Sequence, residues 1–169
     1  MIVVVNDANI LIDLVKLQLL PHFFSLQLRF YTTDLILNEL HDWQVEELQL
    51  YINSGTLIII QLTDLELVEV ALLQAEKRQL SEQDCSAIVC ARKVTGTLLT
   101  SDKNLRNFAV KKALTVIGHL WVFDKMIDEN AISPQHAIEK LIELREVVNP
   151  RLNLPKIECE NRLEMWRRK

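Results

Sequence analysis

The 169-residue sequence contains few glycines and few cysteines, and it has no long apolar run. With only three glycines, it has no glycine-rich phosphate-binding loop and no dinucleotide-binding fingerprint. Its three cysteines, Cys85, Cys90 and Cys159, lack the Cys-x-x-Cys spacing of metal sites. We expect them to be small buried hydrophobic residues in a reducing compartment, without a disulfide framework.

The sequence predicts neither a transmembrane helix nor a signal peptide. No apolar run approaches the roughly 20 residues that a transmembrane helix needs. The N-terminus lacks the basic region of a signal peptide, and Asp7 interrupts its apolar stretch early. We therefore expect a cytoplasmic protein without a membrane partner.

Positive charge is also scarce. The chain has 19 lysines and arginines against 23 aspartates and glutamates, which gives a net charge of −4. This balance argues against a protein that holds nucleic acid by bulk positive charge. It leaves room for a nucleic-acid enzyme in which a metal-loaded site and local basic patches do that work.

The sequence alternates between short β-rich runs and longer helical ones. Hydrophobic residues make up 49% of the chain, enough for one domain (1–169) with a real core. Strands are predicted at 2–5, 30–32, 56–62, 97–100 and 114–117. This order predicts an α/β fold, a three-layer α/β/α sandwich with a mostly parallel five-stranded sheet.

Capping residues mark the starts of the predicted helices. Thr63 or Asp64 begins a helix whose apolar residues recur at Leu65, Val68, Leu72 and Ala75. Ser81 begins another helix, with Ala87, Ile88 and Ala91 along one face, and Ser133 followed by Pro134 begins a third. We divide the chain into a core unit (1–118), a closing helix pair (119–150) and a tail (151–169). Leu163 and Trp166 predict that the tail docks on the core.

Several acidic residues follow predicted strands or begin predicted helices. Asp7 follows the first strand, Asp34 the second and Asp102 the fourth, while Glu39 lies about one turn into the helix that Asp34 begins. Asp84 lies in the first turn of the helix that leads to the fourth strand. Because ligands of parallel sheets bind outside the carboxyl ends of the strands, these acids are expected near one cleft.

Two interpretations of the acids are open. Asp7 and Asp102 suit ordinary helix N-caps, and Ser81 with Asp84 resembles a capping box. Capping does not require the acids to converge, however, and clustered carboxylates favour Mg²⁺ or Mn²⁺ with phosphate and water completing the shell. Thr100 and Ser101 are then placed to orient a water or a phosphate oxygen.

Four segments of the chain together resemble a PIN domain. They are "VVVNDANILIDL", "TDLILNEL", "LSEQDCSAIVCA" and "LLTSDKNL", which occur in that family's order over roughly the first 120 residues. The later "GHLWVFDKMIDENAISPQHAIEKLIEL" and "NPRLNLP" are similar, more loosely, to the C-terminal part of toxin-like, VapC-related bacterial PIN proteins.

The resemblance implies a metal-dependent ribonuclease that hydrolyses RNA at an acidic cleft. It implies Asp7, Glu39, Asp84 and Asp102 as catalytic residues and as ligands of Mg²⁺ or Mn²⁺, with Asn9 fixing the Asp7 loop. Ser81 and Thr100, with Ser101, would give polar support. It also implies a homodimer and, as for many members, a toxin with a cognate antitoxin. Lys103 and Arg106 are the residues that could contact RNA; a solvated helix face is the alternative.

Other functions were weighed against this one. A catalytically inactive PIN-like module for RNA binding or assembly is expected to lack at least one acid, whereas all four are present. A haloacid-dehalogenase-type phosphatase needs Asp-x-Asp after the first strand, where this chain has Asp7-Ala8-Asn9. A receiver domain needs a lysine after the last strand, where Gly118-His119 stands.

Overall fold

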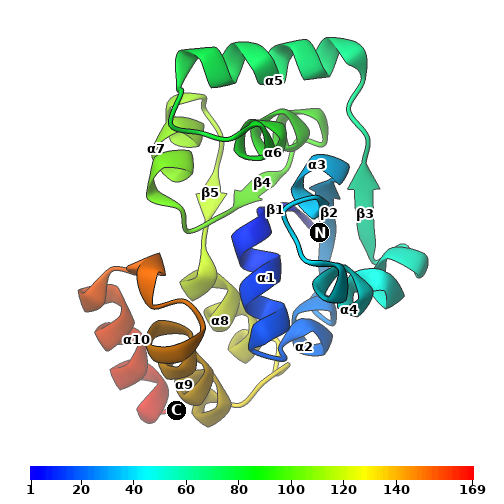
Figure 1. The fold of residues 1–169 in the computed structure, drawn as a ribbon. Coiled ribbons are helices and arrows are strands. Elements are labelled where there is room, and N and C mark those ends of the chain that lie inside the picture. The colour runs from blue at the N-terminus through cyan, green and yellow to red at the C-terminus, as the bar shows by residue number, and fades with distance from the viewer.

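The computed structural model describes residues 1–169 and contains one five-stranded sheet with helices on both sides (Figure 1). All five predicted strands are present, with ends shifted by one or two residues. The strands are β1 (Ile2–Asn6), β2 (Leu28–Thr33), β3 (Leu57–Ile60), β4 (Thr97–Leu99) and β5 (Val116–Ile117).

Every strand pair in the sheet is parallel, and the spatial order is β3-β2-β1-β4-β5. From β1 the chain moves outward to β2 and β3, then returns to place β4 on the other side of β1. The point between β1 and β4 is therefore the topological switch point, where parallel α/β sheets bind their ligands. The predicted α/β class with a parallel sheet is confirmed.

Helices cover the sheet above and below in the view of Figure 1. One group contains α5 (Asp64–Glu76), α6 (Glu82–Lys93) and α7 (Lys103–Lys111), and the short α3 (Asp34–Leu37) packs near α6. The other contains α1 (Ala8–Lys16), α2 (Leu20–Phe24), α4 (Asp42–Asn53), α8 (His119–Asp128), α9 (Pro134–Glu143) and α10 (Lys156–Arg167). A π turn, η1 (Leu144–Val148), and a 3₁₀ turn, η2 (Pro150–Leu152), connect α9 to α10.

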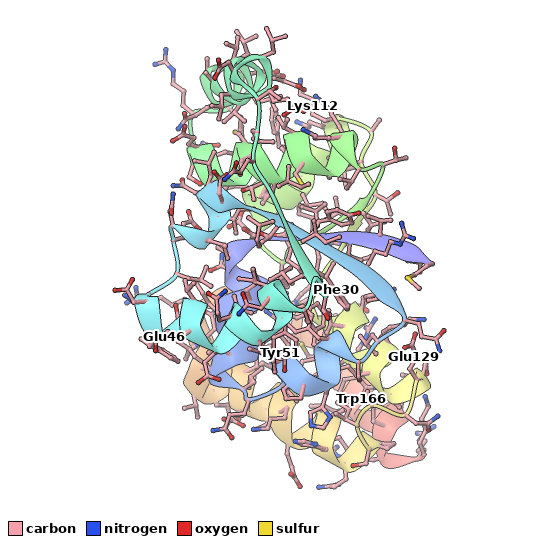
Figure 2. All side chains as sticks on the ribbon, turned by 90° about the vertical axis from the view of Figure 1, so that its right-hand side faces the viewer. Phe30, Glu46, Tyr51, Lys112, Glu129 and Trp166 are labelled. Atoms are coloured by element: carbon pink, nitrogen blue, oxygen red, sulfur yellow. The ribbon has the colours of Figure 1, made fainter.

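The core is a single cluster of 45 buried hydrophobic residues. Its aromatic part joins β2 to α2, with the rings of Phe23 and Phe24 4.8 and 5.0 Å from that of Phe30. Tyr51 of α4 stacks on Phe24 at 4.2 Å, and Figure 2 labels Phe30 and Tyr51 in this region. Offset and edge contacts of this kind add to the area that the rings bury.

The predicted core face of α5 is wrong. Leu65, Val68 and Leu72 are exposed, and the helix instead buries Val70 and Leu73. The physical reason is that α5 packs on α6, not on the sheet, and ion pairs join it to α6 and to the residue after α7. These pairs are Glu66 with Lys93 (2.9 Å), Glu69 with Arg92 (2.6 Å) and Glu76 with Lys112 (2.6 Å), the last labelled at Lys112 in Figure 2.

The three cysteines are free and buried, as predicted. No helix in the structure has both the length and the apolar character needed to cross a bilayer.

The C-terminal tail docks on the closing helix pair, as predicted. α10 buries Leu163 and Trp166, and the Trp166 indole N–H donates to Asp124 Oδ1 of α8 at 3.2 Å. Arg162 Nε donates to the other oxygen of Asp124 at 2.8 Å. Figure 2 shows Trp166 among the C-terminal helices.

We predict that Trp166→Ala lowers the free energy of unfolding by about 3–5 kcal/mol, because it empties a buried aromatic site. Urea unfolding followed by circular dichroism measures this change. Met165→Ala, on the same helix but 44% exposed, is the control and should stay within about 0.5 kcal/mol of wild type. If Trp166→Ala lowers the free energy of unfolding as little as Met165→Ala does, α10 is held without the Trp166 contact.

Candidate functional site: an acidic cluster at the switch point

The carboxyl ends of β1 and β4 place Asp7 and Asp102 on the same edge of the sheet. The Asp7 amide continues the ladder by donating to Leu99 O at 3.1 Å. The Thr100 hydroxyl donates to Asp7 Oδ2 at 2.8 Å, and the Asp102 amide donates to the Thr100 hydroxyl at 3.1 Å. Thr100 therefore connects the two acids, which supports the role predicted for it.

Three of the four predicted acids also cap helices, so the capping interpretation is correct for these three. Each carboxylate uses one oxygen to accept a backbone N–H in the first turn of its helix. The bonds run from Ala8 N to Asp7 Oδ1 (2.7 Å), from Ser81 N to Asp84 Oδ2 (2.8 Å) and from Leu105 N to Asp102 Oδ1 (2.7 Å).

Several carboxylate oxygens of the four acids take no part in helix capping. The second carboxylate oxygens of Asp84 and Asp102 accept no hydrogen bond from the protein, and the Glu39 carboxylate accepts none at all. The caps fix the direction of each side chain while these oxygens stay available to a ligand. Capping and ligand binding are therefore compatible.

The negative charges of the four acids act on one another. Burial raises the pKa of Asp7 to about 7, against an ordinary value of 3.8, although the Thr100 hydroxyl lowers it. The negative charges of Asp84 and Glu39 raise the pKa of Asp7 further. Burial also raises the pKa of Asp84, hydrogen bonds from Ser81 lower it, and the charge of Asp102 raises it. Asp84 thus interacts with each of the other three acids.

Glu39 does not lie where the sequence places it. The helix that begins at Asp34 ends at Leu37, so Glu39 stands in an exposed turn after α3. Partial burial of its carboxyl raises its pKa, and the charge of Asp84 raises it further. Asp34 contributes to none of these shifts, and its carboxylate accepts a hydrogen bond only from the Leu35 amide, at 2.9 Å.

The donor set fits a divalent cation. No lysine or arginine lowers the pKa of Asp7, Glu39 or Asp84, so their mutual repulsion is uncompensated within the protein. Oxygen ligands with excess negative charge suit Mg²⁺ or Mn²⁺, which keep several waters and need few protein ligands. No three His, Cys, Asp or Glu side chains are already drawn together as a compact metal cage.

Ser81 and Asn9, which were also predicted to support the acids, differ in the contacts that they make. Ser81 caps α6 and its hydroxyl accepts from the Asp84 amide at 3.0 Å, which fixes that acid. Asn9 is exposed and makes no hydrogen bond to Asp7, so the prediction that it fixes this loop is wrong. Asn6 fixes the end of β1 instead, donating to Tyr31 O at 3.1 Å, and its Oδ1 is buried without a partner.

A buried hydrogen-bond chain beside the acids was not predicted. His119 Nε2 lies 2.9 Å from Asp13 Oδ2, and His119 Nδ1 lies 2.8 Å from Ser101 Oγ. The Asn149 side-chain amide donates to Asp13 Oδ2 at 3.0 Å. Ser101 is therefore hydrogen-bonded to His119. It is not free to orient a ligand, which is the role that the sequence suggested for it. Asp13, an acid among apolar neighbours of α1, was the available signal, because a buried carboxylate needs partners.

Lys103 and Arg106 line a cleft of about 840 Å³ next to the acids. Asp102 belongs both to the wall of this cleft and to the acidic cluster. The rest of the wall comes from β5, the start of α8, the segment 149–155 and α10. The cleft thus opens beside the candidate site.

We predict that Asp7→Asn stabilises the metal-free protein increasingly as pH rises. Between about pH 4 and pH 7 the folded state retains a proton that the unfolded state has lost, so stability falls as pH increases. A rise of the pKa from 3.8 to about 7 corresponds to roughly 4 kcal/mol. The difference between variant and wild type should grow from near zero at about pH 4 to roughly that value at about pH 8.

Urea unfolding at several pH values in chelator measures this difference. Asp34→Asn is the control, because Asp34 also begins a helix after a strand but lies outside the cluster. A pH-independent difference for Asp7→Asn would show that the Asp7 carboxyl titrates normally.

The comparisons with known proteins agree with this geometry. No curated protein matches the chain. A family model described as a PIN domain matches residues 3–154, a stretch that includes all four acids and all five strands except the first residue of β1. The chain therefore belongs to the PIN domain family, whose fold is of the nuclease type.

Proposed function

We propose that this PIN domain is an endoribonuclease that hydrolyses RNA phosphodiester bonds with Mg²⁺ or Mn²⁺ held by Asp7, Glu39, Asp84 and Asp102. The observation that supports the proposal is that Thr100 joins Asp7 to Asp102 by hydrogen bonds at the switch point, while the charge of Asp84 acts on the other three acids. When bound there, the metal would activate water and stabilise the leaving oxygen.

The protein's own residues hold the acids in place. Thr100 fixes one oxygen of Asp7 at 2.8 Å, and the Ser81 amide fixes one oxygen of Asp84 at 2.8 Å. The free oxygens of Asp84 and Asp102 and the carboxylate of Glu39 are then the groups available to the cation. Placement at the switch point, beside a cleft with Lys103 and Arg106, gives an extended polyanion access.

The rival hypothesis is an inactive module that binds RNA or assembles with other proteins. The presence of all four acids favours the enzyme, because burial together with the charges of Asp84 and Glu39 raises the pKa of Asp7, a cost that serves no purpose in a binding module. A cognate antitoxin and a homodimer, both implied by the resemblance, stay predictions.

We predict that Asp84→Asn abolishes both Mn²⁺ binding and metal-dependent RNA cleavage. The loss of cleavage should be at least about 100-fold, because Asp84 is the acid that contacts the others electrostatically. Asparagine still accepts the Ser81 amide through its Oδ1, so the cap and the fold are retained. Calorimetric titration with Mn²⁺ and cleavage of a labelled RNA measure the two effects.

Glu82→Gln is the matched control. Glu82 lies two residues before Asp84 in the same helix, is exposed, and loses the same charge on substitution. It should bind Mn²⁺ and cleave RNA like wild type. Wild-type protein that binds no Mn²⁺ at millimolar concentration would favour the binding module, and equal cleavage by Asp84→Asn and wild type at matched purity would defeat the proposal.

A further inference from the structure

The backbone that leads into Asp102 is held by residues from a later part of the chain. The Thr100 amide donates to Ile117 O of β5 at 2.9 Å. The Ser101 hydroxyl oxygen accepts from the His119 amide at 3.0 Å and lies 2.8 Å from His119 Nδ1. The direction in which the Asp102 side chain points therefore depends on contacts that the two preceding residues make with β5 and the start of α8.

From Ser101 a chain of hydrogen bonds continues into the interior. His119 Nε2 lies 2.9 Å from Asp13 Oδ2, and the Asn149 side-chain amide donates to the same oxygen at 3.0 Å. Asp13 and His119 are 1% and 3% exposed, and Asp13 has no lysine or arginine partner. The chain thus joins α1, the start of α8 and the residue that follows η1 to the segment that carries Asp102.

The contacts assign the protons of this chain. A carboxylate only accepts hydrogen bonds, so His119 donates to Asp13 from Nε2, and Nδ1 of the neutral ring accepts from the Ser101 hydroxyl. The Ser101 oxygen in turn accepts from the His119 amide. Every polar atom of the three side chains then has a partner, which holds the Ser101 hydroxyl in one orientation.

Two features of the backbone allow the chain to form. The π turn η1 closes with the Asn149 amide donating to Leu144 O, five residues earlier, at 2.8 Å, and Asn149 then reaches Asp13 of α1. At the other end, Gly118 lets the turn between β5 and α8 approach Ser101, because a Cβ on Gly118 would lie 2.6 Å from Ser101 Oγ. The local backbone is therefore adapted to the hydrogen bonds at both ends.

Folding stability alone does not account for a buried polar chain of this kind. Burying polar groups costs desolvation, and apolar side chains of the same volume often stabilise a protein as much. The chain ends at the residue before Asp102, and its members Ser101, His119 and Asn149 line the same cleft as Asp102. Hydrogen bonds behind a metal ligand typically orient that ligand and raise the affinity for the metal.

We infer that four positioning residues fix the direction of Asp102 for metal binding, namely Ser101, His119, Asp13 and Asn149. The inference rests on the proposed function, in which Asp102 is a metal ligand. It gives the part of the chain after residue 118 a role at the site, because two of the four residues come from there. Asp7 and Asp84, by contrast, accept their hydrogen bonds from residues before 118.

The substitution Ser101→Ala tests the inference, because it separates Asp102 from the chain while the bonds farther along the chain remain. Calorimetric titration of the full-length protein should show Mn²⁺ binding about tenfold weaker than in wild type. Ser133→Ala is the matched control. The Ser133 hydroxyl also accepts from a backbone amide, that of His136 at 3.1 Å, but it lies outside the cleft. The control should bind Mn²⁺ like wild type.

Hydrogen exchange in chelator reports on Asp102 without a metal. The Leu105 amide donates to Asp102 Oδ1 at 2.7 Å, and the Asp84 amide, at the matching position of α6, donates to Ser81 Oγ at 3.0 Å. Global destabilisation accelerates exchange of both amides alike, whereas loss of positioning accelerates exchange at Leu105 alone. The ratio of the Leu105 rate to the Asp84 rate should rise about tenfold in Ser101→Ala and stay unchanged in the control.

Asn149→Ala tests the far end of the chain. The variant keeps the backbone amide that closes η1 and loses the donor to Asp13. Mn²⁺ affinity should fall and the exchange ratio should rise, each by a smaller factor than in Ser101→Ala, because Ser101 keeps its contacts with His119.

Weaker Mn²⁺ binding together with a raised exchange ratio in both variants supports the inference. A wild-type value of either quantity in either variant, or the same changes in Ser133→Ala, overturns it. The proposed function fails separately. If wild-type protein binds no Mn²⁺, that function is rejected, and the exchange ratio alone decides whether the chain fixes Asp102. If Asp84→Asn abolishes Mn²⁺ binding while Ser101→Ala leaves binding and ratio unchanged, the metal site stands and the inference falls.

Discussion

A parallel sheet whose strand order changes direction between β1 and β4 brings the residues that follow these strands to one edge, and the candidate site depends on this constraint. Asp7 and Asp102 are 95 positions apart in the chain, yet Thr100 hydrogen-bonds to both. α6, which packs against β1, β2 and β4, then carries Asp84 to the same place. The topology assembles the acids before any ligand is present.

Bringing like charges together lowers the free energy of unfolding, and hydrogen bonds to the carboxylates offset part of this loss. Asp7 is buried with a raised pKa and yet accepts two hydrogen bonds, while Asp84 and Asp102 each receive a capping amide. The roughly 4 kcal/mol that the raised pKa of Asp7 represents comes mainly from burial and is what remains after its hydrogen bonds have lowered that pKa. A site that remains unfavourable after these compensations is typical of functional positions.

The sequence predicted those features that local patterns determine. The five strands, the caps at Ser81 and Ser133, and the acids at strand ends follow from short-range chemistry and from the parallel order of the sheet. The orientation of α5 did not follow, because the helix is apolar around more than one side and only its packing on α6 selects Val70 and Leu73. The early end of α3 at Leu37 likewise left Glu39 in a turn that periodicity alone had placed on a helix.

Hydrogen bonds between residues far apart in the chain could not be predicted from the sequence. Nothing in the spacing of Asp13, His119 and Asn149 indicates that they meet, because their association depends on where α8 and the π turn η1 place them. Hydrogen bonds across 106 and 136 positions are a property of the finished fold. Only the presence of Asp13 among apolar neighbours hinted that a partner was required.

The reach of Asn149 back to Asp13 has a consequence for biosynthesis. On the ribosome the amino-terminal segment emerges first, and Asp13 must wait for position 149 before its carboxylate acquires an amide donor. The edge of the sheet that carries the acids therefore gains this support only after α8 and η1 have been synthesised. A nascent chain that stops before position 149 would lack this support, which ties maturation of the acidic edge to synthesis of the segment that follows α9.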